Sequence, residues 1–243
     1  MKALILAAGT ASRLRPLTEH TPKCLLKIGD RSLLQRSIDA LRSNGIERFC
    51  IVTGYLHEMI EQFVTEHYPT LDVVFIHNPI FASTNNIYSL WLARSVAEGE
   101  DVLLLDSDLL YDPAIVGRVL SAPSPNILTL IRHELGEEEM KVVVDAHGDI
   151  LEVNKTCNPT DAIGESLGIE KMGCEYTKAL YAELECMMNT EHLENKYYEM
   201  AFERLIAQGY RFRVLDASDL FSCELDTVAD FENAKQLIPA ELY

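Results

Sequence analysis

Leu6-Ala-Ala-Gly9-Thr-Ala-Ser-Arg13-Leu-Arg15-Pro16-Leu-Thr18, followed closely by Thr21-Pro22-Lys23, is the most informative stretch of this sequence. The apolar run before it, Ala3–Ala7, breaks into Gly9, which is typical of a buried strand that enters a turn. Small residues there let the backbone approach a ligand, and successive N–H groups form an anion-binding concavity. Arg13, Arg15 and Lys23 add cations that suit triphosphate oxygens. The stretch therefore predicts a nucleoside triphosphate site after the first strand.

The alternative for this stretch is a surface loop with solvated basic side chains. The clustering of one glycine and three cations within 15 residues of a very acidic chain counts against that interpretation. Two other phosphate-binding patterns are absent. Gly9 has no glycine two residues further on, which weakens a dinucleotide-binding GxGxxG site, and no GxxxxGK[ST] motif occurs.

The composition is that of one globular α/β domain. The 243 residues are 48% hydrophobic and 24% charged, so a sizeable core is available without disulfides or a structural metal. The formal net charge of −17 argues against a nucleic-acid binder and against anchoring on an anionic membrane. Anionic substrates would have to be held by a local cluster of cations and backbone N–H groups.

The cysteine pattern indicates a reducing compartment. None of the six cysteines forms a CxxC pair, so we expect free thiols and no zinc site. No signal peptide is recognisable, and no apolar run reaches the roughly 18–20 residues of a membrane span. We expect a cytoplasmic location.

The first half of the chain alternates strands and helices. Strands are predicted at Ala3–Ala7, Phe49–Thr53, Asp72–His77 and Val102–Asp106, and helices at Ser32–Ser43, His57–His67, Asn86–Ala97 and after Asp112-Pro113. This spacing predicts right-handed βαβ units and a parallel sheet with helices on both faces.

The second half has shorter strands and a hairpin. Strands are predicted at Ile127–Arg132, Lys141–Asp145, Ile150–Asn154, Arg211–Leu215 and Ser222–Leu225, with helices near Tyr176–Met188 and Lys196–Gln208 and a final helix opened by the capping box Thr227-Val-Ala-Asp230. We predict one α/β domain over residues 1–243, a Rossmann-like three-layer αβα fold with a mixed, mainly parallel central sheet. Residues 1–112 are expected to form the NTP-binding half and residues 113–243 the acceptor-binding half.

Two pairs of acids follow predicted strands. Asp106-Ser-Asp108 ends an apolar strand, and Glu224-Leu-Asp226 ends a short strand near the carboxyl terminus. Ligands bind at the carboxyl ends of strands in open α/β sheets, and two carboxylates on one edge suit Mg²⁺. The alternative is a strand-end turn with solvated acids.

The amino-terminal stretch resembles the signature of the sugar-phosphate nucleotidyltransferase superfamily, written loosely as LAAGxGxRLxPxT…PK. The chain departs from it once, with Ala11 where glycine is usual. The resemblance covers nearly the whole chain and implies the fold of the nucleotide-diphospho-sugar transferases. It also implies that Leu6, Ala8, Gly9, Arg13, Lys23 and Asp106 bind the nucleotide, that Lys23, Arg13 and Asp108 are catalytic, and that Asp108 and Asp226 share a Mg²⁺ ion.

A second segment narrows the resemblance. Ser83-Thr-Asn85-Asn86-Ile-Tyr88-Ser89-Leu90 is similar to a segment of the phosphocholine and aminoethylphosphonate cytidylyltransferases. The similarity assigns Asn85 to the nucleotide and Asn86 to the acceptor, whereas physics alone allows a simple helix N-cap. Lys155 follows the hairpin strand, where a lysine in these enzymes often meets the acceptor phosphate. A solvated lysine is the alternative.

Tyr197-Tyr198-Glu199 starts a predicted helix and combines aromatic rings with a carboxylate, which suits a cationic amine. We therefore add Tyr198 and Glu199 to the acceptor site, with helix packing as the alternative. The middle strand has Met140-Lys141 and no tryptophan for an aromatic cage like that of the phosphocholine enzymes, which counts against choline. Trp91, the single tryptophan, is expected in the core.

The resemblance implies a nucleotidyltransferase of the EC 2.7.7 type that uses CTP and Mg²⁺. It would transfer CMP to phosphocholine, phosphoethanolamine, aminoethylphosphonate or a similar small acceptor and release pyrophosphate. A phosphate or phosphonate acceptor is largely dianionic near pH 7, so direct attack on the α-phosphorus needs no general base. The alternatives are a sugar-1-phosphate enzyme that uses UTP, dTTP or GTP, and a non-catalytic nucleotide-binding sensor. The oligomeric state stays open, with a homodimer among the states allowed.

Overall fold

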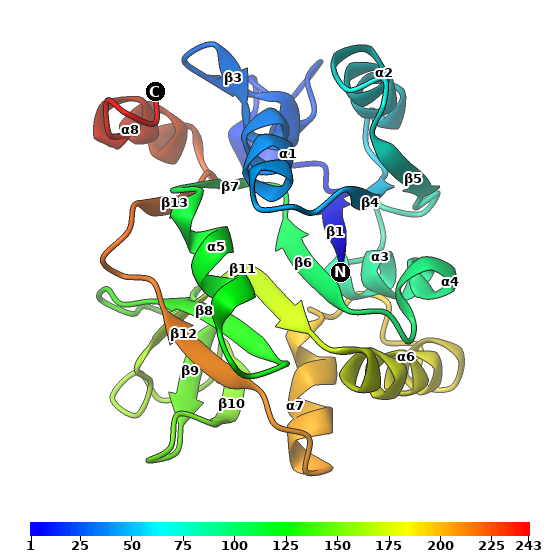
Figure 1. Cartoon of the computed structure of the whole chain (residues 1–243), viewed down its shortest axis with the longest axis vertical. Coiled ribbons are helices and arrows are strands. Elements are labelled where there is room, and N and C mark those ends of the chain that lie inside the picture. Colours follow the sequence, from blue (N-terminus) through cyan, green and yellow to red (C-terminus); the bar gives the residue numbers. More distant parts are fainter.

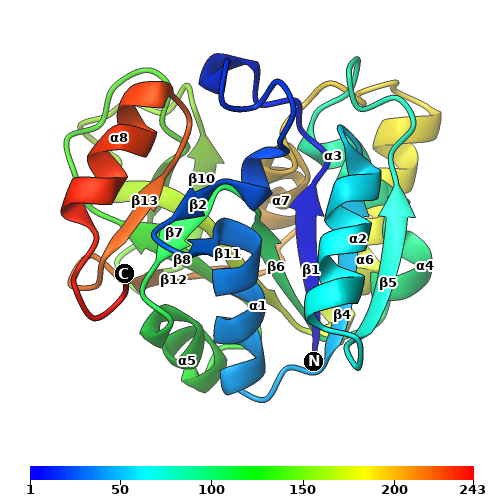
Figure 2. The ribbon, with the colours of Figure 1, turned by 90° about the horizontal axis from the view of Figure 1, so that it is seen from above.

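The first half of the chain forms the parallel part of the central sheet. The computed structural model describes all 243 residues. Its parallel strands are β1 (Lys2–Ala7), β4 (Arg48–Thr53), β5 (Asp72–His77) and β6 (Val102–Asp106), in the order β6-β1-β4-β5 (Figure 1). Each was predicted from its apolar run. The arrows of β1, β4 and β5 point to one edge of the molecule, where the loop after β1 lies (Figure 2).

The helices between these strands also follow the prediction, with one difference. They are α1 (Leu33–Ser43), α2 (His57–His67), α3 (Asn86–Leu92) and α4 (Arg94–Ala97). The single helix expected over Asn86–Ala97 is divided at Ala93, whose ψ of 1° leaves the helical range.

The second half extends the sheet with mostly antiparallel pairs. Its strands are β8 (Ile127–Ile131), β9 (Lys141–Val144), β10 (Ile150–Asn154), β11 (Gly164–Met172) and β12 (Arg213–Asp216), and the order across the sheet is β10-β9-β11-β6-β1-β4-β5, with β8 between β11 and β12. The helices here are α5 (Ala114–Ser121), α6 (Cys174–Asn189) and α7 (Glu199–Ala207). The mixed, mainly parallel sheet is confirmed.

β11 joins the two halves and was not predicted. It pairs antiparallel with β6 on one side and with β8 and β9 on the other. The sequence of β11 lacks the apolar pattern of a buried strand, because it contains charged Glu170 and Lys171 as well as Gly168. Gly168 has φ +75°, where the register with β8 shifts. A bulge of this kind breaks the alternation by which strands are recognised.

A small antiparallel pair lies outside the main sheet. β7 (Leu109–Tyr111) pairs with β13 (Ser222–Glu224), and the Leu225 N–H donates to the Asp108 carbonyl at 3.2 Å. This pairing places the two acid-bearing strand ends side by side, although they are more than 100 residues apart in sequence. The remaining short elements are β2 (Lys27–Ile28), β3 (Arg31–Ser32), the 3₁₀ turns Ser12–Leu14 and Lys23–Leu25, and α8 (Val228–Leu237).

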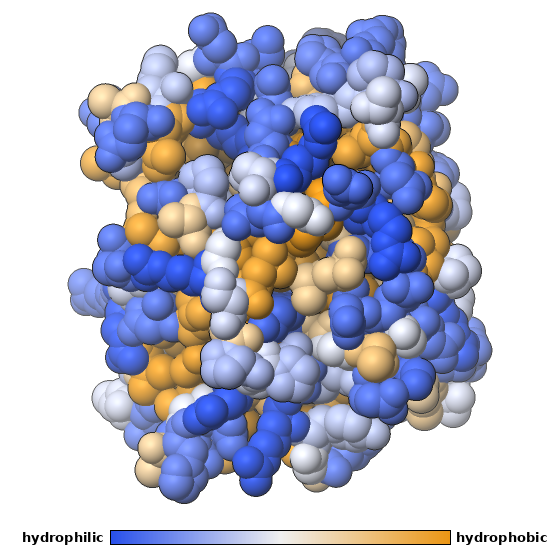
Figure 3. All heavy atoms as spheres, in the orientation of Figure 1, coloured by the Kyte–Doolittle hydropathy of each residue, from blue (hydrophilic) through white to orange (hydrophobic).

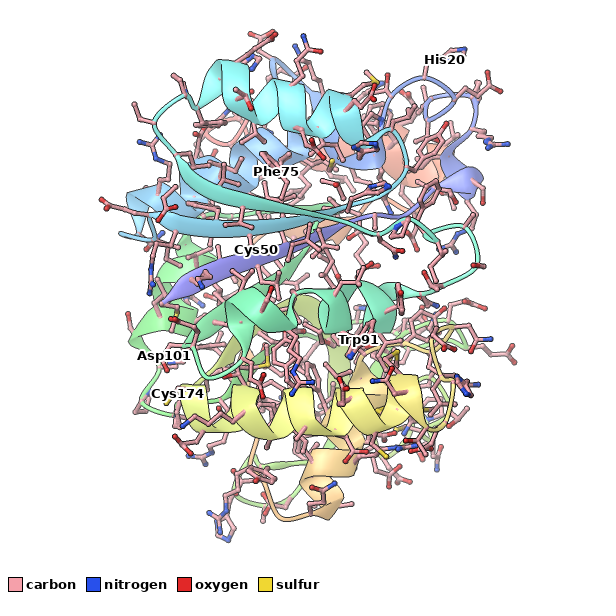
Figure 4. The ribbon with its side chains drawn as sticks, turned by 90° about the vertical axis from the view of Figure 1, so that its right-hand side faces the viewer. His20, Cys50, Phe75, Trp91, Asp101 and Cys174 are labelled. Carbon is pink, nitrogen blue, oxygen red and sulfur yellow. The ribbon has the colours of Figure 1, made fainter.

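Helices cover both faces of the sheet. Figure 4 shows α2 on one side of β4 and β5, and α3 and α6 on the other, with Trp91 between the latter two helices. Two large apolar clusters fill the spaces, one containing Leu4 and Leu104 and the other Ile5 and Leu105. Successive residues of one strand thus serve opposite faces, as strand geometry requires. This is the predicted three-layer αβα arrangement.

The outer surface is mainly polar. Figure 3 shows the face that carries α1 and α5, where hydrophilic side chains predominate and apolar atoms appear in patches between them. No helix combines the length and the apolar character needed to cross a bilayer.

Candidate active site

A cleft with a volume of about 890 Å³ opens at the carboxyl ends of β1 and β6. Both halves of the chain contribute to its lining. It brings together twelve of the thirteen residues predicted for the site, namely Leu6, Ala8, Gly9, Arg13, Lys23, Asn85, Asn86, Asp106, Asp108, Lys155, Glu199 and Asp226. The exception is Tyr198.

Lys23 lies between the two predicted metal ligands. Its Nζ is 2.8 Å from Asp108 Oδ2 and 2.7 Å from Asp226 Oδ1, and its side chain is only 12% exposed. Burial alone would lower the pKa of Lys23, but the two carboxylates outweigh it and raise that pKa above its ordinary value. The lysine is therefore a fixed positive charge at the centre of the cleft.

Arg13 reaches the same acids from the amino-terminal loop. Its Nη2 is 2.6 Å from Asp226 Oδ2, and its side chain is 62% exposed. Although burial acts in the opposite direction, Lys23 and Arg13 together hold the pKa of Asp226 below its ordinary value. Asp226 thus stays ionised near neutral pH and connects both cations.

The amino-terminal loop has an unusual backbone at Ala11. Ala11 adopts φ 47° and ψ 47°, the left-handed region that favours glycine. This geometry gives a physical reason for the glycine that is usual at this position in the resembled signature. The Thr18 hydroxyl donates to the Ala11 carbonyl at 2.8 Å, and this bond holds the loop in the conformation despite the alanine side chain.

A buried polar network lies beneath the cleft and contains Tyr198. The Tyr198 hydroxyl is 3.1 Å from Asp106 Oδ2 and 3.4 Å from Glu170 Oε2, and the Ser166 hydroxyl donates to Glu170 Oε1 at 3.3 Å. Burial, and then the neighbouring Glu199, raise the pKa of Glu170 well above its ordinary value. Because Tyr198 is fully buried, it supports the cleft from below instead of contacting the acceptor as predicted.

Its neighbour Tyr197 lines the cleft instead, and this residue was missed. Lys155 Nζ lies 4.8 Å from the centre of the Tyr197 ring, a cation–π distance. The sequence signal was present in the pair Tyr197-Tyr198, but only the helix direction decides which ring faces inward. Lys155 also contacts exposed Glu138 at 3.4 Å.

Glu199 is the most unusual acid of the cleft. The residue is 6% exposed, and its Oε2 atom is buried without a hydrogen-bond partner. Burial raises the pKa of Glu199 to about 7, and Lys155 opposes this shift. A buried oxygen without a partner in a ligand-sized cleft is a strong sign of a missing donor.

The two asparagines act in the helix start and also line the cleft. The Asn86 N–H donates to Asn85 Oδ1 at 2.7 Å, so the N-cap interpretation of Asn85 is confirmed. Asn86 Oδ1 accepts the Tyr198 N–H at 3.0 Å, which ties α3 to the start of α7. Asn85 and Asn86 line the cleft while they make these hydrogen bonds.

The donor set fits a divalent cation that keeps much of its water. Asp108 and Asp226 each place an oxygen within 2.8 Å of one ammonium, so a single positive charge can contact both carboxylates. Asp106 and Glu224, a further acid that was not assigned a role, line the same cleft. No group of three or more histidine, cysteine or acidic side chains converges as a ready-made metal site. Two carboxylates completed by water and phosphate oxygens are what Mg²⁺ usually takes.

Fold and site together define a class. A mixed αβα sheet, a cationic loop after the first strand and acids at the ends of two neighbouring strands are the architecture of a nucleotidyltransferase of the nucleotide-diphospho-sugar transferase type. A sequence profile of the MobA-like NTP transferase domain matches residues 3–161, and the chain belongs to this family.

Relatives extend the match beyond that segment. The CTP:phosphoglutamine cytidylyltransferase of Campylobacter jejuni is 24% identical over 252 residues, which cover 96% of this chain and 98% of that protein. The CMP-5'-(3-aminopropyl)phosphonate synthase of Streptomyces rubellomurinus is 26% identical over 240 residues, and the aligned region covers 96% of this chain but 38% of that protein. The solved structure of CTP:phosphocholine cytidylyltransferase from Streptococcus pneumoniae has a TM-score of 0.80 at 21% identity, with 98% of this chain and 99% of that chain covered, and shares the fold.

Proposed function

We propose that the protein is a CTP-dependent cytidylyltransferase that transfers CMP to a small phosphorylated or phosphonate acceptor and releases pyrophosphate. The observation that carries the proposal is the position of Lys23, fixed between Asp108 and Asp226 in the cleft that also holds Arg13 and Lys155. The full-length similarity to a relative named as a cytidylyltransferase supports the choice of CTP.

The proposed mechanism is direct displacement. An oxygen of the acceptor attacks the α-phosphorus of the nucleotide, and pyrophosphate leaves from the opposite side. Lys23 and Arg13 offset the charge of the triphosphate, while Gly9 and Ala8 let the loop backbone approach it. No residue needs to remove a proton, because the acceptor is already an anion near pH 7.

Asp108 and Asp226 are the proposed metal ligands. Asp108 and Asp226 would hold Mg²⁺, which screens the repulsion between the two phosphate groups when bound. Asp106 would support Asp108 from the end of β6, where Tyr198 orients its carboxylate from below.

The acceptor would bind against the wall of the cleft that the second half of the chain forms. Lys155 would meet its phosphate or phosphonate, and Glu199 and Asn86 would meet the rest of the molecule. Leu6 and Asn85 would lie against the nucleotide in the opposite wall. A cytoplasmic location belongs to the same proposal, supported by six cysteines that are all free thiols.

Two alternatives make different predictions in one assay. A sugar-1-phosphate nucleotidylyltransferase would use UTP, dTTP or GTP with a sugar phosphate, and a sensor would bind nucleotide without turnover. More remote relatives of the first kind exist, such as the UTP–glucose-1-phosphate uridylyltransferase of Haloferax volcanii, which is aligned over 32% of this chain.

The experiment is a pyrophosphate-release assay with each of the common NTPs and a panel of phosphorylated acceptors. We expect release that requires both CTP and an aminoalkyl phosphate or phosphonate, is abolished by EDTA and is restored by excess Mg²⁺. Turnover only with a sugar 1-phosphate would contradict the proposal, as would nucleotide binding without release for every combination. The double variant Asp108→Asn/Asp226→Asn should lose the Mg²⁺ response and serves as the matched control.

A further inference from the structure

We infer that His133 is an imidazolium ion in the working enzyme and a positioning residue for the acceptor, through an ion pair with Glu165 that holds the connection between β8 and β9 at the cleft. The inference rests on the proposed function, since it concerns how well the acceptor binds. It adds a titrating group to the site, where none of the residues assigned so far is a histidine.

His133 follows β8 at the edge of the sheet where the cleft opens. β8 runs antiparallel to β11, and β11 runs antiparallel to β6, so the carboxyl ends of β8 and β6 lie at the same edge. His133 and Glu165 both line the cleft. A change of charge on this histidine therefore acts on any anion bound there.

Hydrogen-bond acceptors face both ring nitrogens of His133. Its Nε2 is 2.7 Å from Glu165 Oε2, and its Nδ1 is 2.8 Å from the Glu134 carbonyl oxygen. A neutral imidazole has one N–H and can donate only one of these bonds, whereas imidazolium donates both. Burial raises the pKa of Glu165, against the effect of His133. The shared proton still belongs on the imidazole, which is ordinarily more basic than a carboxylate by about 2 pKa units.

The groups around His133 favour its charged form. Burial lowers the pKa of His133, but the hydrogen bonds and the charge of Glu165 outweigh burial and raise that pKa above its ordinary value of 6.5. Glu139 acts in the same direction from the connection itself, and Glu224 on β13 lies beyond Glu165. The neighbouring cation, Arg132, is paired with a carboxylate of β12 at 2.5 Å. Negative charge thus predominates around the ring.

The ion pair holds one end of the connection between β8 and β9. At the other end, the buried Lys141 ammonium donates to the Glu139 carbonyl oxygen at 3.2 Å. Between the two ends lies Glu138, whose Oε2 is 3.4 Å from Nζ of Lys155, the residue proposed to meet the acceptor phosphate. Loss of the pair at His133 would release this connection and disturb the acceptor side of the cleft.

Acceptor binding should therefore weaken as the pH rises. Because the pKa of His133 in the folded state is raised above 6.5, the pair is present below pH 6.5 and is lost as the pH rises through the folded-state value. Loss of the proton turns a neutral pair into a net negative charge beside the anionic acceptor. The acceptor phosphate keeps its own charge above about pH 7, so it does not cause this change.

The first test is pyrophosphate release with CTP, Mg²⁺ and O-phosphoethanolamine at pH 7 and pH 8.5. For wild type we expect KM for the acceptor to be about 3- to 10-fold higher at pH 8.5, the range for a partly exposed charge-assisted pair. His133→Gln keeps a donor for Glu165 but cannot titrate. Its KM for the acceptor should already be raised at pH 7 and should lack this part of the rise, with little change in kcat or in KM for CTP. Any contribution from Glu199 remains in both proteins.

His67→Gln is the matched control. His67 Nδ1 also faces a backbone carbonyl, that of Phe63 at 2.9 Å, but the residue is exposed on α2 and its Nε2 has no carboxylate partner. This variant should follow wild type at both pH values. The same pH dependence of the acceptor KM in wild type and His133→Gln would overturn the inference and leave the proposed function standing.

The second test does not depend on turnover. Ring-nitrogen NMR spectra of protein with isotope-labelled histidine should show His133, assigned by its absence from His133→Gln, with protons on both nitrogens at pH 7. Its titration midpoint should lie above 6.5 and should fall in Glu165→Gln. A neutral His133 ring at pH 7 would overturn the inference. No pyrophosphate release with any NTP and acceptor would contradict the proposed function, and the acceptor role of His133 with it.

Discussion

Lys23 is held in the cleft more firmly than a surface lysine. Two carboxylates lie within 2.8 Å of its ammonium, and its side chain is only 12% exposed. The Mg²⁺ ion proposed for the same two carboxylates would replace these ion pairs, and the ammonium of Lys23, still in the cleft, would then turn to the charge of the triphosphate.

Replacing Lys23 by Ala should therefore lower kcat/KM by about 100- to 1000-fold, the equivalent of ~3–4 kcal/mol of transition-state stabilisation. The measurement is steady-state pyrophosphate release with CTP and a saturating acceptor. Lys27→Ala, an exposed lysine four residues further on, is the matched control and should be near wild type. Near wild-type turnover of Lys23→Ala would refute the assigned role.

Tyr198 is a second single residue on which the site depends, and it lies beneath the cleft. Tyr198→Phe keeps the ring in the core and removes the hydroxyl that lies between Asp106 and Glu170. The hydroxyl has one hydrogen for the two acids, so one of them then loses its donor, and we expect the free energy of unfolding to fall by about 1–3 kcal/mol, measured by urea denaturation. Tyr197→Phe, at the exposed neighbouring ring, should change it by less than about 0.5 kcal/mol. Equal stability of the two variants would show that the buried network contributes nothing.

At the scale of elements, β11 positions the acids of β6. Gly168 lies in the bulge of β11, and a Cβ atom built there would be 2.8 Å from Asp106 Oδ2. The backbone of β11 is therefore packed directly against a residue of the site. A glycine allows this approach both by its positive φ and by its missing side chain.

Gly168→Ala should destabilise the protein by about 1–3 kcal/mol more than Gly209→Ala. Both glycines have positive φ, at +75° and +93°, but a Cβ atom at Gly209 would meet nothing within 4 Å. The difference in their unfolding free energies thus isolates the clash with Asp106 from the backbone penalty. Pyrophosphate release should also fall in Gly168→Ala alone. Equal destabilisation by the two substitutions would mean that Asp106 can move without cost.

At the scale of the whole molecule, an excess of acids converges beneath the cleft. One of them is Glu199, whose pKa burial raises from about 4.5 to about 7. The charged or titratable groups around it are Lys155 after β10, Glu203 on α7, Glu170 on β11, Asp106 on β6 and Tyr198 before α7. Because the folded state binds the proton of Glu199 more tightly than the unfolded state, its contribution to stability is greatest below pH 4.5. That contribution is lost as the pH rises through about 7.

Wild-type protein should therefore lose roughly 1–3 kcal/mol of stability through this residue between pH 5 and pH 8. Glu199→Gln cannot ionise and should not show this part of the loss, while contributions from the other acids remain in both proteins. Urea denaturation at the two pH values measures the difference, with Glu58→Gln, the same substitution on the exposed face of α2, as the control that should follow wild type. An identical pH dependence in wild type and Glu199→Gln would contradict the assignment.

Some features follow from local chemistry and could be predicted from the sequence. The strands before Gly9 and Asp108, the helices between them and the capping box of α8 depend on hydrophobic period, turn residues and caps within a few positions. The cationic loop and the acids that follow β6 were found in the same way, since ligands bind at the carboxyl ends of parallel strands. Asp226 follows β13, outside that sheet, and was assigned from the resemblance.

Other features depend on contacts between residues far apart in sequence. β11 escaped prediction because its charged side chains find partners far away in sequence that no local window contains: the Tyr198 hydroxyl contacts Glu170, and Lys171 donates to the Ala122 carbonyl. The choice between Tyr197 and Tyr198 was also beyond the sequence, because neighbouring residues at a helix start face different directions and only packing selects the buried one.

The sequence by itself determined the αβα class, because hydrophobic periodicity predicts the strands and helices. It also determined which charged and polar residues are available for the cleft, because these follow from residue type and motif. Only the tertiary structure decided that Lys23 bridges Asp108 and Asp226, and that Glu199 is left without a donor. These outcomes depend on the pairing of β7 with β13 and on the packing of α7 against the sheet. Such long-range arrangements are set by the sum of many weak contacts, which no short stretch of sequence specifies alone.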